Sequence, residues 1–209
     1  MKKIDGIILD VDGTLWDSTP IVADAWTRAV KDGDGGDILV TADMLKKLFG
    51  RTMTVIADLL LPQLEPQKRY AIMDICCEYE HHALEEDPCN ICYPNVKETI
   101  RELAKKVPVF IVSNCQSGYI ELFLAKTGLG DVVRDIECFG NTGKCKGDNI
   151  RLLMERNNLT SPIYVGDTQG DCDASKEAGV PFIFAAYGFG TADQMEGQIQ
   201  SFDELLAFV

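Results

Sequence analysis

The feature that most constrains the fold is a short apolar run, Ile7–Leu9, that stops abruptly at two carboxylates. A fully apolar, mostly β-branched run of this kind is typical of a strand buried on both faces of a parallel sheet. Asp10 and Asp12 follow two residues apart, so in an extended backbone their side chains project the same way. Gly13 then permits a turn, and Thr14 adds a hydroxyl to the same end of the strand.

Two carboxylates this close need a partner, because like charges a few ångströms apart are costly unless a cation or a shared proton relieves them. A hard divalent cation fits best. Mg2+ prefers oxygen ligands, takes one or two protein carboxylates and completes its shell with water and substrate phosphate. A polar turn after a strand is the competing interpretation, since Asp and Gly are common in turns.

Two patterns follow along the chain. Residues 17–87 show helical spacing of apolar residues interrupted by Gly and Pro, which predicts helices at Pro20–Val30, Thr41–Phe49, Thr52–Leu61 and Gln67–Leu84. From Val96 on, helices alternate with further apolar runs, which predict strands at Val107–Val112, Ile136–Phe139, Ile163–Val165 and Pro181–Ala185. The helices of this second part are expected at Val96–Lys105, Tyr119–Lys126, Asp148–Asn157, Cys172–Ala178 and Phe202–Phe208. Alternating strands and helices predict an α/β fold, a parallel sheet with helices on both faces, with an all-helical insert after the first strand.

Polar side chains end three of the expected strands. Asp10 and Asp12 follow the first, Ser113 and Asn114 the second, and Asp167 a later one. Ligands of open α/β sheets bind outside the carboxyl ends of the strands. We therefore expect these side chains to form one site.

Residues 10–15, DVDGTL, resemble the first motif of the haloacid dehalogenase (HAD) superfamily, and residues 166–171, GDTQGD, resemble its fourth. The resemblance implies a Rossmann-like core in which Asp10 is a nucleophile that forms an aspartyl-phosphate. It makes Asp12 a general acid/base that also offers its backbone carbonyl to Mg2+. Asp167 becomes a metal ligand, and Asp171 belongs to the inner or outer shell of the metal.

The remaining family positions can be matched as well. Ser113 resembles the second motif, whose hydroxyl and neighbouring amides hold a phosphate oxygen, together with Asn114. A lysine is also required to neutralise the transferred phosphoryl group. Lys146 and Lys144 both stand in the right interval. Lys146 is preferred, because Asp148 or Asn149 can cap a helix beginning at Ile150 and place it before a positive helix end.

The helical insert is similar to the C1 cap of the phosphoglycolate phosphatase-like branch. The expected domains are thus a core at residues 1–16 and 89–209 and a cap at residues 17–88. Within the cap, Arg51 resembles part of the substrate-specificity loop, with an ordinary exposed arginine as the alternative. The β-phosphoglucomutase relatives carry a histidine where this chain has Val22, which disfavours a mutase. Trp16 and Trp26 are expected to pack near the hinge, and residues 187–190 to form a loop of unknown role near the site.

Composition limits the partners. Acidic residues outnumber basic ones, 33 to 20, and the net charge of -13 argues against nucleic acid or an anionic membrane. No apolar segment resembles a signal peptide or membrane span, so a cytoplasmic location and reduced cysteines are expected. The single C-x-x-C, at residues 89–92, has no second pair, and no zinc site is expected there.

Together the residues and the resemblance predict a Mg2+-dependent phosphatase that acts on a small phosphorylated metabolite. Thr14 and Arg51 complete the expected substrate-binding residues. A sugar-phosphate mutase and a pyrophosphatase are alternatives within the superfamily. Outside enzymes, a receiver-like phospho-acceptor domain gathers similar groups, but it lacks a helical lobe after the first strand. The sequence leaves the substrate and the oligomeric state open.

Overall fold

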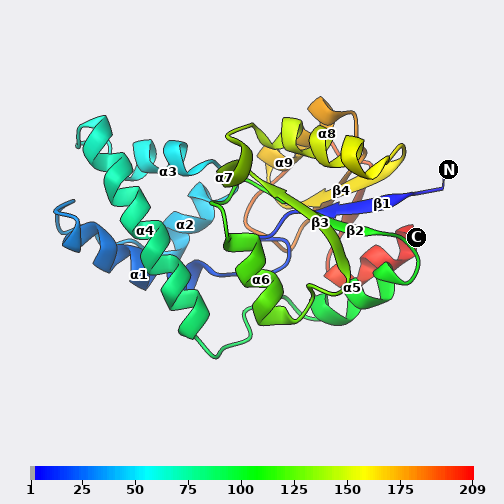
Figure 1. Ribbon diagram of the computed structural model, residues 1–209, viewed down its shortest axis with the longest axis horizontal. Helices are drawn as coiled ribbons and strands as arrows, with labels where there is room; N and C mark the ends of the chain where they lie inside the picture. Colours follow the sequence, from blue (N-terminus) through cyan, green and yellow to red (C-terminus); the bar gives the residue numbers. More distant parts are fainter. Residues whose placement is uncertain (1–2) are drawn as a thin grey trace. The chain divides into compact units, whose positions relative to one another are not determined.

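The computed structural model describes residues 3–209 (Figure 1). Met1 and Lys2, expected to lead into the first strand, lie outside the described residues. The chain divides into two compact units. The α/β unit comprises the residues up to Asp17 and those from Cys92 onward, and the helical unit comprises Ser18–Ile91. That these units act as a HAD core and cap, with boundaries after residues 16 and 88, stays a prediction.

The α/β unit is built on one six-stranded sheet in which every pairing is parallel. Its strands are β1 (Gly6–Leu9), β2 (Val109–Ser113), β3 (Val133–Cys138), β4 (Pro162–Gly166), β5 (Phe182–Ala185) and β6 (Gly197–Ile199). Their order in the sheet is β3-β2-β1-β4-β5-β6. The expected α/β fold with a Rossmann-like parallel sheet is confirmed. Every residue of β1, β2, β4 and β5 is buried, as expected of strands covered on both faces.

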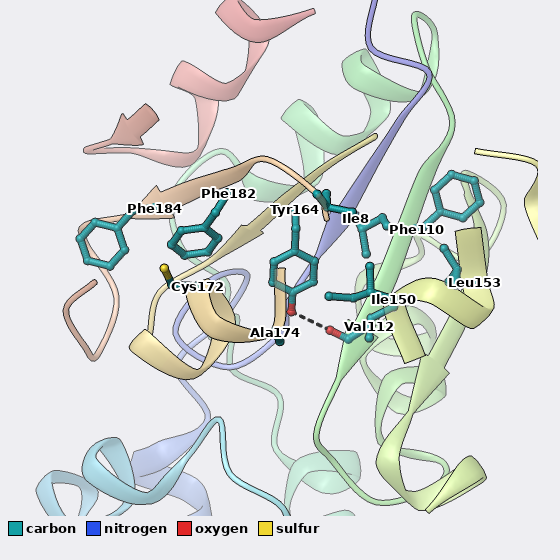
Figure 2. Packing of buried hydrophobic residues seen from close by; sticks show 11 residues of the cluster. Ile8, Phe110, Val112, Ile150, Leu153, Tyr164, Cys172, Ala174, Phe182 and Phe184 are labelled. Atoms are coloured by element: carbon teal, nitrogen blue, oxygen red, sulfur yellow. Dashed lines mark hydrogen bonds between the residues drawn. The ribbon is translucent and has the colours of Figure 1, made fainter. Parts of the chain in front are cut away.

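One face of the sheet packs against α8 (Lys146–Asn157) and α9 (Gln169–Ala178), and Figure 2 shows the core between them. Alternate residues of the central strands point into this core, including Ile8, Phe110 and Tyr164. Tyr164 is the polar member. Its hydroxyl lies 3.1 Å from the Val112 carbonyl oxygen, a contact drawn in Figure 2. This buried hydroxyl comes from the central strand β4.

The other helices of the α/β unit are α5 (Val96–Ala104), α6 (Tyr119–Thr127), α7 (Phe139–Thr142) and the 3-10 helix η1 (Phe202–Phe208). α5 packs on η1 and on β2. Two elements were not predicted because they are too short for a periodic pattern: β6 has three residues and α7 has four. The strand predicted at Ile136–Phe139 is β3, which begins three residues earlier at Val133 and ends at Cys138, because Phe139 begins α7. The expected cap of α8 is also wrong. The helix begins at Lys146 after Cys145, so Asp148 and Asn149 lie inside it.

The helical unit contains α1 (Thr19–Asp32), α2 (Ala42–Leu48), α3 (Met53–Leu60) and α4 (Pro66–Glu86). α1 packs on α4, which buries residues at a four-residue spacing: Ile72, Cys76, Glu80 and Leu84. The row is apolar except for Glu80. That carboxylate accepts a hydrogen bond from the Trp26 indole at 2.8 Å. No helix among residues 3–209 is long and apolar enough to cross a membrane.

Candidate active site

The candidate site lies where the strand order reverses, between β1 and β4. Asp10 directly follows β1, and its backbone N–H donates to the Val165 carbonyl of β4 at 2.9 Å. Asp167 directly follows β4. Parallel sheets open a crevice at such a switch point, outside the carboxyl ends of the strands. The topology therefore brings together two carboxylates that are 157 residues apart in the chain.

Lys146 joins this pair from the first turn of α8. Its ammonium nitrogen lies 2.9 Å from Asp10 Oδ1 and 2.6 Å from Asp171 Oδ1, and the side chain is 3% exposed. Lys144, the other candidate of the sequence, is exposed. The buried lysine in contact with the expected nucleophile is therefore Lys146.

Asp171 is held by a dense set of donors at the start of α9. Its Oδ2 accepts from the Thr168 hydroxyl at 2.6 Å and from the Thr168 backbone at 3.0 Å. Thr168 accepts in return from the Asp171 backbone, which completes a capping box. On the other side, the Tyr164 hydroxyl lies 3.2 Å from Asp171 Oδ1. Asp171 thus both caps α9 and fixes Lys146.

The Asp167 carboxylate has one backbone donor and one side-chain hydroxyl as neighbours. The Phe189 N–H donates to its Oδ2 at 2.7 Å, and the Thr14 hydroxyl lies 3.5 Å from its Oδ1. Gly13 adopts a φ of +80°, and a Cβ there would lie 2.1 Å from Asp167 Oδ2. Only glycine permits that approach at Gly13. The loop after β5, at residues 187–190, therefore has a role that the sequence left open: it helps to fix Asp167.

Burial dominates the electrostatics of the cluster. It raises the pKa of Asp10 to about 7, against the lowering effect of Lys146, and Asp171 adds to the rise. The pKa of Asp167 is also raised, by burial first and then by the charges of Asp171 and Asp10. Burial alone would lower the pKa of Lys146, but the two carboxylates outweigh it and leave its pKa above the usual value. One cation thus faces three buried carboxyl groups, so ionising all three would leave an excess of negative charge that a further cation could balance.

The cluster fits a hard metal ion. Asp10, Asp167 and Asp171 each offer an oxygen, and the three atoms lie within 4.8 Å of one another. An all-oxygen set with excess negative charge suits Mg2+. A second group of this kind among the described residues, Cys145, Asp148 and Glu177, is at least partly exposed. Neither group includes Cys89 or Cys92, and no disulfide links any two of the described cysteines.

Asp12 points to a different set of partners. Its Oδ1 accepts from the Trp16 indole at 3.0 Å and from the Tyr119 hydroxyl at 2.6 Å. It is not part of the three-carboxylate group. The sequence placed Trp16 in packing alone and did not single out Tyr119. Nothing in the chain short of the fold indicates that Tyr119, 107 residues away, reaches this carboxylate.

The other predicted residues are Ser113, Asn114 and Arg51. Ser113 ends β2 and is buried, and Asn114 follows it. Arg51 is exposed and lies between α2 and α3 of the helical unit. Their substrate-binding roles, and that of Thr14, stay predictions.

The comparison with known families decides the identity. The family model described as haloacid dehalogenase-like hydrolase matches residues 7–185, which include every residue of the cluster. The chain belongs to this family. It is a HAD superfamily hydrolase, as the DVDGTL and GDTQGD motifs indicate.

Curated relatives of this hydrolase include phosphoglycolate phosphatases. That of Vibrio cholerae is 30% identical over 209 aligned residues, which cover 90% of this chain and 87% of the relative. That of Vibrio vulnificus strain CMCP6 is also 30% identical, over 90% of this chain and 86% of the relative. Both matches span nearly the whole length of the hydrolase.

Solved structures share the fold. A predicted phosphoglycolate phosphatase from Haemophilus somnus has a TM-score of 0.85 at 22% identity and covers 100% of this chain and 99% of its own. CbbY from Rhodobacter sphaeroides, solved with phosphate, has a TM-score of 0.82 at 18% identity and covers 97% and 96%. At these identities the likeness concerns the fold alone.

Proposed function

We propose that this hydrolase is a Mg2+-dependent phosphatase that cleaves small phosphate monoesters through an aspartyl-phosphate on Asp10. The observation that carries the proposal is the buried contact of Lys146 with Asp10, 2.9 Å apart at the switch point of the sheet. A lysine beside a buried carboxylate serves two needs of phosphoryl transfer. It favours the ionised nucleophile, and it offsets the charge on the phosphoryl oxygens.

The first half-reaction forms the acyl phosphate. The Asp10 carboxylate attacks phosphorus in line with the ester oxygen, and the phosphorus–oxygen bond to the alcohol breaks. Asp12 gives its proton to that leaving oxygen. Ser113, Asn114 and Lys146 hold the equatorial phosphoryl oxygens, which carry the charge in the transition state.

The second half-reaction regenerates the enzyme. Asp12, now a carboxylate, takes a proton from water, and the oxygen of that water attacks phosphorus. Asp10 leaves as a carboxylate and inorganic phosphate is released. Asp10 and Asp167 would hold Mg2+ with the Asp12 backbone carbonyl, while Asp171 orients Lys146 beside them. When bound, Mg2+ supplies charge that screens the nucleophile from the phosphate dianion.

The relatives suggest which small phosphate ester is the substrate. Phosphoglycolate is the first candidate, because the relatives at 30% identity bear the name phosphoglycolate phosphatase. In this proposal residues 17–88 act as a cap over the site, and Arg51 meets an anionic leaving group. A mutase is disfavoured by Val22 at the position of the mutase histidine. A cytoplasmic location stays a prediction.

The test is steady-state phosphate release from a panel of esters, with and without Mg2+. The panel includes phosphoglycolate, sugar phosphates, pyrophosphate and an aryl phosphate. We expect turnover that requires Mg2+ and falls to background in Asp10→Asn, with Lys144→Met as an active control. Turnover that is unchanged by EDTA or by Asp10→Asn would contradict the proposal. A single stoichiometric phosphorylation without turnover would favour the receiver-like alternative.

A further inference from the structure

The Asp12 carboxylate accepts hydrogen bonds from two aromatic side chains that are not part of the family motifs. Trp16 Nε1 and the Tyr119 hydroxyl both donate to Asp12 Oδ1, at 3.0 and 2.6 Å. The distance of 2.6 Å lies at the short end of the range for O–H···O hydrogen bonds. The two donors come from different segments, the turn after β1 and the start of α6. Both bonds end on Oδ1, so together they hold that oxygen in place and limit the rotation of the carboxyl group.

The donors are themselves held in place. Trp16 and Tyr119 are each 1% exposed. Their rings meet edge to face with centroids 5.6 Å apart, and Trp16 makes a second edge contact with Phe123 at 5.0 Å. The Trp16 backbone also bridges to Asp12 and to Cys92. Neither ring can turn without disturbing packed neighbours, so the two hydrogen bonds have a rigid origin.

A general acid acts only within hydrogen-bond reach of the oxygen it protonates, and small misplacements are costly. An aspartate with free side-chain torsions would spend little time in that geometry. We propose that Tyr119 and Trp16 are positioning residues, which aim Asp12 at the leaving oxygen of the ester. This inference rests on the proposed function, because it concerns the proton that Asp12 delivers as the ester bond breaks. The two aromatic side chains keep their own protons throughout.

The inference predicts a specific kinetic signature. Alcohols of low acidity leave only with a proton, whereas 4-nitrophenolate leaves readily without one. Loss of one of the hydrogen bonds that position Asp12 should therefore slow the hydrolysis of alkyl phosphates far more than that of 4-nitrophenyl phosphate. A general loss of stability would lower both rates in parallel, so the ratio separates the two causes.

The experiment measures kcat/KM for wild type and Tyr119→Phe over esters whose leaving alcohols span a range of acidity. We expect roughly 10- to 100-fold loss on alkyl phosphates, with about a twofold change or less on 4-nitrophenyl phosphate. Trp16→Phe keeps a ring at the position and should shift the ratio in the same direction. Trp26→Phe removes an indole–carboxylate bond in the helical unit and should leave the ratio unchanged.

Asp12→Asn, alone and combined with Tyr119→Phe, completes a double-mutant cycle. Once the acid is removed, Tyr119→Phe should add no further loss on alkyl esters. An active wild type in which both aromatic variants keep the wild-type ratio would overturn this inference and leave the phosphatase intact. A wild type that hydrolyses none of the esters would instead overturn the proposed function, and this inference with it.

Discussion

Each unit of this hydrolase contains one tryptophan whose indole donates to an acidic side chain, yet the two pairs have different surroundings. In the α/β unit, Trp16 donates to Asp12, which lies two residues from Asp10 and its buried cluster. In the helical unit, Trp26 of α1 donates to Glu80 of α4 within an otherwise apolar row. Among the described residues, no metal-capable group of acidic, His or Cys side chains falls in the helical unit.

The difference separates two uses of the same contact. A single buried carboxylate that is hydrogen-bonded by its neighbours can join two helices. Several buried carboxylates that share one lysine raise one another's pKa values and require a further cation, which is typical of catalytic sites. Glu80 is an example of the first arrangement and Asp10 of the second. We therefore propose that the α/β unit carries out the chemistry and that the Trp26–Glu80 pair has a structural role.

The largest expected effect is a loss of activity when Lys146, the lysine shared by Asp10 and Asp171, is replaced. Lys146→Met removes the ammonium that contacts Asp10 and Asp171. We expect kcat/KM to fall roughly 10²- to 10³-fold or more, as when one charge-stabilising donor is removed from other active sites. Lys144→Met, an exposed change two residues earlier, is the control and should keep wild-type kinetics. Equal losses in the two variants would erase the distinction between a catalytic and a surface lysine.

The second effect is on the stability of the metal-free protein. Asp10 has a pKa of about 7 when folded, against 3.8 ordinarily. Between these values the folded protein keeps a proton that the unfolded chain has released, so the free energy of unfolding falls as pH rises. The slope from this one group is at most about 1.4 kcal/mol per pH unit, and it ends near pH 7.

Asp10→Asn removes the pH dependence that comes from Asp10. In urea unfolding with EDTA, the free energy of unfolding of the variant should therefore rise relative to that of wild type from about pH 4 to about pH 7. Added Mg2+ should restore stability to wild type more than to Asp10→Asn. Curves that stay parallel across this pH range would show that burial does not set the protonation of Asp10.

Breaking the Trp26–Glu80 pair should lower stability and leave turnover nearly unchanged, in contrast to Lys146→Met. Trp26→Phe removes the indole donor to a buried carboxylate, and we expect it to lower the free energy of unfolding by about 1–3 kcal/mol. Because Glu80 is not part of the three-carboxylate group, we expect turnover of the folded variant to stay within about twofold of wild type. Urea denaturation and steady-state kinetics on the same preparation measure both. A large loss of kcat with unchanged stability would place the helical pair in the catalytic machinery.

The smallest effect is expected at the second metal-capable group. Asp148 belongs to the group of Cys145 and Glu177 but pairs with Arg151 at the protein surface. Asp148→Asn should change neither turnover nor the Mg2+ concentration that gives half-maximal activity, because exposed ion pairs contribute little. An increased Mg2+ requirement would show that this surface group also holds a metal.

The sequence predicted those parts of the site that depend on local pattern. Asp10, Asp12 and Asp167 follow apolar strands, and the parallel sheet brings such strand ends to one edge. The preference for Lys146 over Lys144 agrees with the burial of Lys146, although the argument from a helix cap was wrong. The helix begins at Lys146 itself, with Cys145 as its N-cap residue.

The contacts that the sequence missed depend on the fold. In the sequence, Tyr119 is simply the first residue of a predicted helix. Only the packing of α6 beside the first motif brings its hydroxyl to Asp12. Phe189 acts on Asp167 through its backbone N–H, which no side-chain pattern can indicate. The two-unit division coincides with a change in the spacing of apolar residues along the sequence. β6 was not predicted, because three residues are too few to show a periodic pattern.

The central claim is that Asp10 carries the phosphoryl group during turnover. The most direct measurement is a rapid acid quench of the enzyme with Mg2+ and 32P-labelled substrate, followed by peptide mapping. We predict a transient label on the peptide that contains Asp10, released by neutral hydroxylamine as expected of an acyl phosphate and absent from Asp10→Asn. Full turnover with no protein-bound label at any quench time, or label that persists in Asp10→Asn, would contradict the account.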